Sequence, residues 1–273
     1  MTKHLGISLA AVPLLATAGT AEAQQVPDPR VADLVQAGKL RVALFLPMYA
    51  RDPVTNELRG FGPGAVFMDV ARSLAARIGV DVLLMGYQVP HEVVECLKTG
   101  ACDVALMGAQ RSRAVEVDFS PPIVHLDYTC LVPAGSEIRT VAGADRPGIR
   151  IAVVRNHAST LALGRMLEHA EQIAVEVPDV AFDLLRSGRA DVFASVRPAL
   201  MEYSARLTGS RVLEDRYGFN PVVMAVAKDQ AGRLAFISEF IEEAKASGLV
   251  QRAIERTGVN GVHVAPAGNP DQK

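Results

Sequence analysis

The chain has 273 residues, of which 28 are Lys or Arg and 30 are Asp or Glu, so its formal net charge is −2. This balance excludes the strongly basic proteins that bind nucleic acid, which show a basic stripe or an isoelectric point above roughly 9. Cys96, Cys102 and Cys130 lack the paired spacing of zinc ligands, so we expect no metal and no cofactor.

The first residues have the pattern of a cleavable signal peptide. Lys3 and His4 precede an apolar run over residues 5–15, and residues 21–23 (AEA) supply the small-x-small cleavage pattern. The run is shorter than the roughly 20 residues that a permanent membrane span needs. No cysteine near the cleavage site could carry a lipid. We therefore expect residues 1–23 to be removed and the mature protein to be free in the periplasm.

Strand and helix patterns then alternate along the chain. In the helix expected over 66–78, apolar residues recur every four positions, and Gly79 is expected to end it. This order is typical of a mostly parallel sheet flanked by helices. The first unit has expected strands at 39–45, 80–85 and 103–107, with helices at 66–78 and 92–98.

The same order begins again after a polar connector at 133–136. Two such units in tandem predict an α/β protein with two lobes. A later helix has no partner in the second unit, so it is expected to return to the first. The tail over 266–273 is expected to be disordered. The second unit has expected strands at 149–154, 173–177 and 190–194 and helices at 159–169 and 181–187, followed by a strand at 222–226 and the helix at 232–247.

Four segments resemble the type II periplasmic binding proteins, in particular the family 3 extracellular solute-binding proteins of amino-acid ABC transporters. They are the opening strand at 38–42 (GKLRV), the helix at 70–79 (VARSLAARIG), the stretch from 97–105 (LKTGACDVA) through Arg113 to 117–122 (VDFSPP), and the closing helix at 243–248 (EAKASG).

The resemblance implies a two-lobed protein that captures a solute in the cleft between its lobes, catalyses nothing and delivers the solute to a membrane permease. It is expected to act as a monomer. Two crossing strands, near 126–133 and 216–224, would join the lobes. The lobe boundaries that follow are 24–126 with 224–265 for lobe 1, and 127–223 for lobe 2.

Arg113 falls where the family grips a ligand carboxylate. A guanidinium offers a planar fork of donors that matches a carboxylate with two hydrogen bonds. Met107 and Gly108 lie at the strand end where the family has methionine and threonine, so only backbone donors are expected there.

A second candidate contact lies at Asn156, His157 and Ala158, between an expected strand and a helix N-terminus. Free backbone N–H groups and the helix dipole favour an anion at such a position. Simple capping of the helix by Asn156 or Ser159 is an equally good interpretation. Phe45 and Tyr49 are expected either to wall the cleft or to belong to the core.

The ligand class is expected to differ from that of amino-acid binders. Residues 195–197 (SVR) have no acid where such binders offer one to the ligand's ammonium group. Arg197 would instead add a second positive charge, unless it faces solvent or caps a helix. An unpaired ammonium in a dry pocket is costly. We therefore expect a small anionic solute, a carboxylate or dicarboxylate without an amine.

Three questions stay open from the sequence. A cyclohexadienyl dehydratase-like enzyme on the same fold would need a general acid, for which Glu92, Asp118 and Asp127 are the candidates. A sensory module that acts through a receptor is a further alternative. Cys96 and Cys102 could form a disulfide or remain buried thiols.

Overall fold

The computed structural model describes residues 27–45, 48–87 and 90–268. The expected signal peptide and the last five residues of the tail lie outside this range. Residues 266–268 contact helix α8 (Ala231–Ala246), where Lys245 Nζ donates to the Pro266 carbonyl at 2.9 Å. Within the described part of the chain, no helix is both long and apolar enough to cross a membrane.

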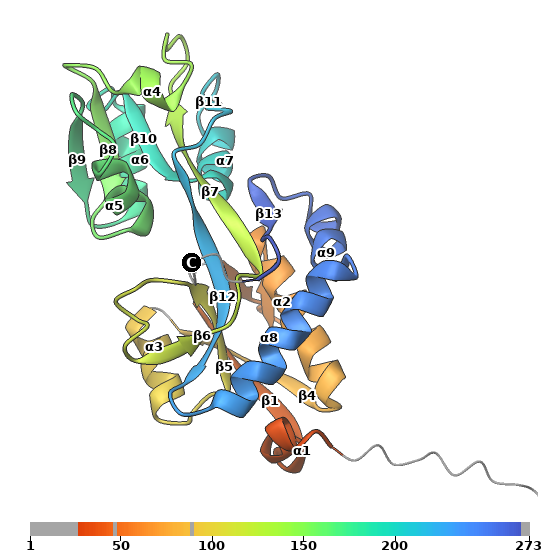
Figure 1. Ribbon diagram of the computed structural model, residues 1–273. Coiled ribbons are helices and arrows are strands. Elements are labelled where there is room, and N and C mark those ends of the chain that lie inside the picture. The colour runs from red at the N-terminus through yellow and green to blue at the C-terminus, as the bar shows by residue number, and fades with distance from the viewer. Residues whose placement is uncertain (1–26, 46–47, 88–89, 269–273) are drawn as a thin grey trace, which may run out of the picture.

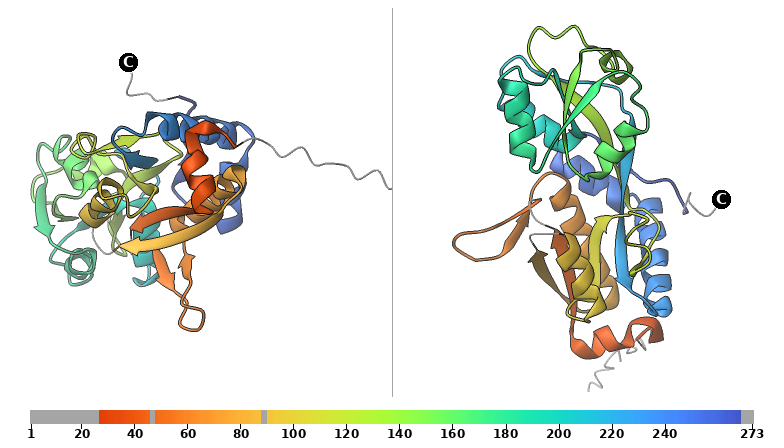
Figure 2. Two further views of the ribbon diagram at one scale, coloured as in Figure 1. Left: turned by 90° about the horizontal axis from the view of Figure 1, so that it is seen from below. Right: turned by 90° about the vertical axis from the view of Figure 1, so that its left-hand side faces the viewer.

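Figure 1 shows two lobes connected by the long strands β7 (Val124–Val132) and β12 (Gly218–Ala227). The first lobe is built on a sheet in which β4, β1 and β5 run parallel and β12 runs antiparallel to β5. Its elements are η1 (Pro29–Val31), α1 (Ala32–Ala37), β1 (Lys39–Phe45), β2 (Tyr49–Arg51), β3 (Leu58–Gly60), α2 (Pro63–Ile78), β4 (Asp81–Tyr87), α3 (Pro90–Lys98), β5 (Val104–Gly108), β6 (Val117–Phe119), α8 (Ala231–Ala246) and α9 (Leu249–Thr257). The hairpin of β2 and β3 projects from this lobe (Figure 2).

The second lobe repeats this plan. Strands β10, β8 and β9 run parallel, and β7 pairs antiparallel with β10. Its elements are α4 (Val141–Ala144), β8 (Arg150–Val154), α5 (Ala158–Gly164), β9 (Glu171–Val175), α6 (Pro178–Arg186), β10 (Val192–Val196), α7 (Arg197–Ala205) and β11 (Arg211–Val212).

In the central strands β1, β5, β8 and β10 side chains on both faces are buried, so these strands are near-continuous apolar runs, whereas the edge strands β4 and β9 are only partly buried. Along β1 and β5 the side chains alternate: Val42 and Val104 pack with α2, α8 and α9, whereas Ala43 and Ala105 pack with α3. In the second lobe, α4 and α5 cover one face and α6 and α7 the other. This explains why the sheet strands could be predicted from apolar patterns.

Three strands form the hinge between the lobes. Strand β7 (Val124–Val132) pairs with β12 (Gly218–Ala227) on one side and with β13 (Val262–Val264) on the other. Every residue of β7 is buried. Since β12 and β7 also pair with strands of the first and second lobes respectively, a single sheet runs through the whole molecule.

The helix predicted over 159–169 is shorter in the structure, where α5 ends at Gly164. The reason is a competing acceptor. Backbone N–H groups of residues 168–170 donate to the Asp145 carboxylate at 2.8–2.9 Å instead of continuing the helix. These bonds hold the pKa of Asp145 at about 2, well below its usual value.

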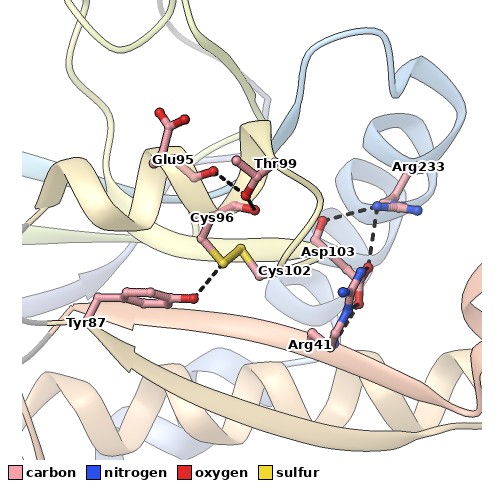
Figure 3. The surroundings of a disulfide bond; sticks show 8 residues. All are labelled: Arg41, Tyr87, Glu95, Cys96, Thr99, Cys102, Asp103 and Arg233. Atoms are coloured by element: carbon pink, nitrogen blue, oxygen red, sulfur yellow. Dashed lines mark hydrogen bonds and ion pairs between the residues drawn. A yellow bond between two sulfur atoms is a disulfide. The ribbon is translucent and has the colours of Figure 1, made fainter.

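Cys96 and Cys102 form a disulfide that ties α3 to the start of β5, with their Cα atoms 5.4 Å apart (Figure 3). Tyr87 Oη donates to Cys96 Sγ at 2.9 Å. For so short a ring, loss of the crosslink should lower the free energy of unfolding by about 2 kcal/mol, mainly because the unfolded chain gains conformational freedom. Urea denaturation of the oxidised protein and of the C96A/C102A variant measures this difference.

Dithiothreitol provides the control for the disulfide prediction. It should lower the stability of the wild-type protein and leave that of C96A/C102A unchanged, because the remaining Cys130 is a buried free thiol. Equal stability of the oxidised protein and the variant would contradict the prediction.

Candidate functional site

A cavity of about 430 Å³ lies between the lobes, against the hinge strands. Its walls come from α5 and the turn after it, from the middle of β7, from β12 with the residue that precedes it, and from the residue that follows β5. In Figure 1, α5 lies at the edge of the second lobe nearest to the first lobe. None of the described lining residues is acidic: they are Ala109, Tyr128, Ala158, Ala162, Arg165, Met166, Tyr217, Gly218, Phe219, Asn220 and Pro221.

Arg113 lies in the turn that follows β5 and is partly buried. Its Nη1 donates to the Gly108 carbonyl at 3.2 Å, and no Asp or Glu of the described chain forms an ion pair with it. Burial lowers the pKa of Arg113, since a desolvated cation loses hydration. A guanidinium still stays protonated at neutral pH. The turn therefore places a positive charge, which has no carboxylate partner among the described residues, beside the end of β5. Arg113 and Gly108 do not themselves line the cavity, but the adjacent Ala109 does.

Gly108 leaves room for a polar side chain of the cavity wall. A Cβ atom at Gly108 would lie 2.7 Å from Oδ1 of Asn220, which is on the neighbouring strand β12. Glycine thus lets the Asn220 amide lie against the end of β5. Met107, the other predicted contact at this strand end, is 6% exposed and packs in the core of the first lobe.

The loop before α5 is arranged around the helix cap. Asn156 is exposed and has a positive φ of 57°. His157 is the N-cap, and its Nδ1 accepts a hydrogen bond from the Ser159 backbone N–H at 3.4 Å. Burial lowers the pKa of His157, which favours the neutral ring. Of this predicted group only Ala158 lines the cavity, and the capping residue is His157 rather than Asn156 or Ser159.

Arg197 has a different position from the one predicted. Its Nη atoms donate to the Leu213 carbonyl at 2.7 Å and to the Glu214 carbonyl at 2.9 Å, and its Nε lies 3.5 Å from Asp127 Oδ2. The side chain is only 11% exposed and packs against Gly261 of the first lobe. Because its donors are occupied within the protein, Arg197 belongs to the hinge and not to the cavity.

Of the two alternatives expected for Phe45 and Tyr49, the structure agrees with the core and not with the wall of the cleft. Tyr49 is 4% exposed within the core of the first lobe, and its hydroxyl group has no partner among the described residues. Burial raises the pKa of this hydroxyl. Phe45, at the end of β1, packs in the separate apolar cluster around α3. Neither ring lines the cavity.

Three aromatic residues that line the cavity, Tyr128, Tyr217 and Phe219, were not predicted from the sequence. Tyr128 and Tyr217 lie at the hinge, with ring centroids 5.7 Å apart, and Phe219 stacks on His125 at 3.9 Å. Both hinge segments were expected near these positions. Because the strands that cross between lobes border the cleft, their aromatic residues were a usable signal.

Comparisons with known proteins agree with this architecture. Residues 46–258 match the family model of the bacterial extracellular solute-binding proteins, family 3. The ABC transporter glutamine-binding protein GlnH of Bacillus subtilis is 26% identical over 207 residues, which cover 72% of each chain.

Solved structures with the same fold include binding proteins and an enzyme. An ancestral cationic amino acid solute-binding protein is 23% identical with a TM-score of 0.67, covering 83% of this chain and 98% of its own. An ancestral cyclohexadienyl dehydratase is 22% identical with a TM-score of 0.55, covering 85% and 97%. These similarities confirm the predicted two-lobed α/β fold.

Proposed function

The chain belongs to the bacterial extracellular solute-binding proteins, family 3, and we propose that it captures a small carboxylate without an ammonium group for an ABC transporter. The solute occupies the cavity between the lobes, here taken as residues 24–126 with 224–265 and residues 127–223. The lobes close on it by bending at β7 and β12. A membrane permease then receives the solute from the closed form.

The observation that carries this proposal is the charge of the cavity. Among its described lining residues the only ionised side chain is that of Arg165. The guanidinium of Arg113 donates to the carbonyl of Gly108, next to the lining residue Ala109, and forms no ion pair with a described carboxylate. A carboxylate would supply Arg113 with a charge-assisted hydrogen bond, which is roughly twice as strong as a neutral one.

An α-amino acid fits this cavity less well. Its ammonium group would lose hydration without gaining a carboxylate, which is costly in a closed site. Ser195, at the position where the family resemblance leads one to expect an acid, is buried on β10 and pairs with Thr129 of β7. The named relatives bind glutamine or cationic amino acids. This cavity therefore supports a different ligand class.

A dehydratase would need a general acid at the cavity. Asp118 pairs with Lys228 at 2.5 Å, and Asp127 pairs with Arg216 at 2.7 Å. Glu92 lies on the exposed side of α3, beside a separate hollow near the disulfide. Because none of the three lines the cavity, binding is the better-supported function.

Thermal-shift measurements on the mature protein test the proposal with matched pairs of acids. Each pair has the same carbon skeleton with and without the α-amine, such as 3-phenylpropionate with phenylalanine and glutarate with glutamate. The acids without an amine should raise the melting temperature, because a ligand at about 100 times its Kd adds roughly 2.7 kcal/mol of stability. The amino acids should have little effect.

Calorimetry of the best pair gives the two dissociation constants directly. Tight binding of an amino acid together with no binding of its amine-free partner would overturn the proposal. Incubation with prephenate, followed as formation of phenylpyruvate, tests the dehydratase alternative. The proposal expects no product above the uncatalysed rate.

A further inference from the structure

A second arginine faces the cavity from the opposite lobe. Arg165 is the C-cap of α5, where its backbone N–H donates to the Ala162 carbonyl at 3.3 Å, and the residue lines the cavity. Its side chain is exposed and forms no ion pair or hydrogen bond within the described chain. It lies close enough to Tyr128 to oppose the rise that burial causes in the pKa of that hydroxyl.

Other arginines of the second lobe differ from Arg165 in their partners. Arg155, just before α5, pairs with Glu176 at 2.6 Å. Arg150 pairs with Asp191 at 2.9 Å. The exposed Arg146 forms no ion pair with a described residue but does not line the cavity. Only in Arg165, among these arginines, does a guanidinium without a carboxylate partner in the described chain also lie at the cavity wall.

The two arginines belong to different lobes. Arg113 follows β5 of the first lobe, and Arg165 ends α5 of the second. Asn220 and Tyr128, on the hinge strands between them, add polar groups but no negative charge. A solute with a single carboxylate would leave one guanidinium without a counter-charge when the lobes close. A solute with two carboxylates would neutralise both and link the lobes through itself.

We propose that Arg165 determines specificity and that the preferred solute is a small dicarboxylate. The inference rests on the proposed function and narrows its ligand class. Arg113 holds one carboxylate, and Arg165 holds the other. The cavity volume of about 430 Å³ limits the solute to a small molecule. Because Arg165 is exposed in the absence of ligand, its removal should change affinity and not the fold.

Isothermal titration calorimetry with wild-type protein, R165Q and R146Q tests the inference. The probes are unbranched dicarboxylates from malonate to adipate, each matched with the monocarboxylate of equal carbon number. For the tightest dicarboxylate, R165Q should raise Kd by about 10- to 100-fold, as expected for loss of a hydrogen bond between charged groups. For the monocarboxylates, Kd should change by less than about twofold. R146Q removes the same charge from the same lobe and should leave both affinities unchanged.

The outcomes separate this inference from the proposed function. If monocarboxylates and dicarboxylates bind the wild-type protein equally well, or if R165Q binds dicarboxylates as tightly as wild type, the role of Arg165 is wrong and carboxylate capture stands. If no carboxylate of either kind binds the wild-type protein, both are wrong. An equal loss in R146Q would show a general charge effect and would also overturn the role of Arg165.

Discussion

Replacement of Arg113 by alanine should raise the Kd of every carboxylate solute by about 30-fold or more. Removing one partner of a buried, hydrogen-bonded charge pair costs about 2 kcal/mol or more, because the other charge is left unpaired in the site. In R113A the group left without a partner would be the solute carboxylate, which the proposed site holds near Gly108 and Ala109. The measurement is calorimetric titration of the solute found in the matched screen.

The neighbouring Arg111 provides the control for Arg113. It occupies the same turn, is exposed and makes no ion pair within the described residues. R111A removes the same charge and should leave Kd within about twofold, since exposed charges at this distance are screened by salt. R113K should recover only part of the affinity, because an ammonium cannot donate the planar pair of hydrogen bonds. Unchanged binding in R113A would remove the basis of the proposed site.

Replacement of Asp127 by alanine should lower the free energy of unfolding by about 2 kcal/mol, between the values for an exposed and a fully buried ion pair, because Asp127 is buried while Arg216 and His263 are about half exposed. Asp127 is on β7 and only 7% of its side chain is exposed. It pairs with Arg216 at 2.7 Å and His263 at 2.9 Å, and it lies 3.5 Å from the buried Arg197. Its backbone N–H also donates to the Gly261 carbonyl. One carboxylate thus connects three hinge elements, and its loss leaves Arg197 without a counter-charge.

Urea denaturation of D127A and of the control D118A measures this contribution. Asp118 pairs with Lys228 on the surface, where both side chains are about a third exposed or more. Exposed pairs contribute about 1 kcal/mol or less. D118A should therefore change stability little. Equal decreases in the free energy of unfolding of D127A and D118A would show that the ion pairs of Asp127 contribute no more than an exposed pair.

Lowering the pH should reduce the contribution of Asp127 to the free energy of unfolding. Burial alone would raise the pKa of its carboxyl, but hydrogen bonds from Arg216 and His263 outweigh burial and hold the pKa below its usual value. A carboxyl with a lowered folded-state pKa stabilises the fold above its unfolded-state pKa of about 3.9. The contribution disappears as pH falls through the lower, folded-state value. The stability difference between wild type and D127A should therefore shrink below about pH 4.

Some features of this protein could be predicted from short stretches of chain. The left-handed Gly79 ends α2 at the expected residue, with φ of 83°. The parallel strands of both lobes were expected because each reads as an apolar run. Residues 97–122, one of the four segments that carried the family resemblance, contain Arg113. In contrast, β13 was missed because three residues are too few to detect a period. Helix α7 is as long as α6 but was missed because only Pro198 and Leu200 of it are buried, which leaves no clear apolar period.

The sequence by itself determined the fold class and family, because amphipathic periods, helix ends and family motifs involve residues close together in the chain. Only the tertiary structure decided which arginine faces the cavity. Arg197 is occupied by the hinge, where Asp127 meets Arg216 and His263, which lie 89 and 136 residues away in sequence. Arg165 is left without a partner at the cavity wall. The partner of a long charged side chain depends on segments that folding brings within about 4 Å, and no local pattern records those approaches.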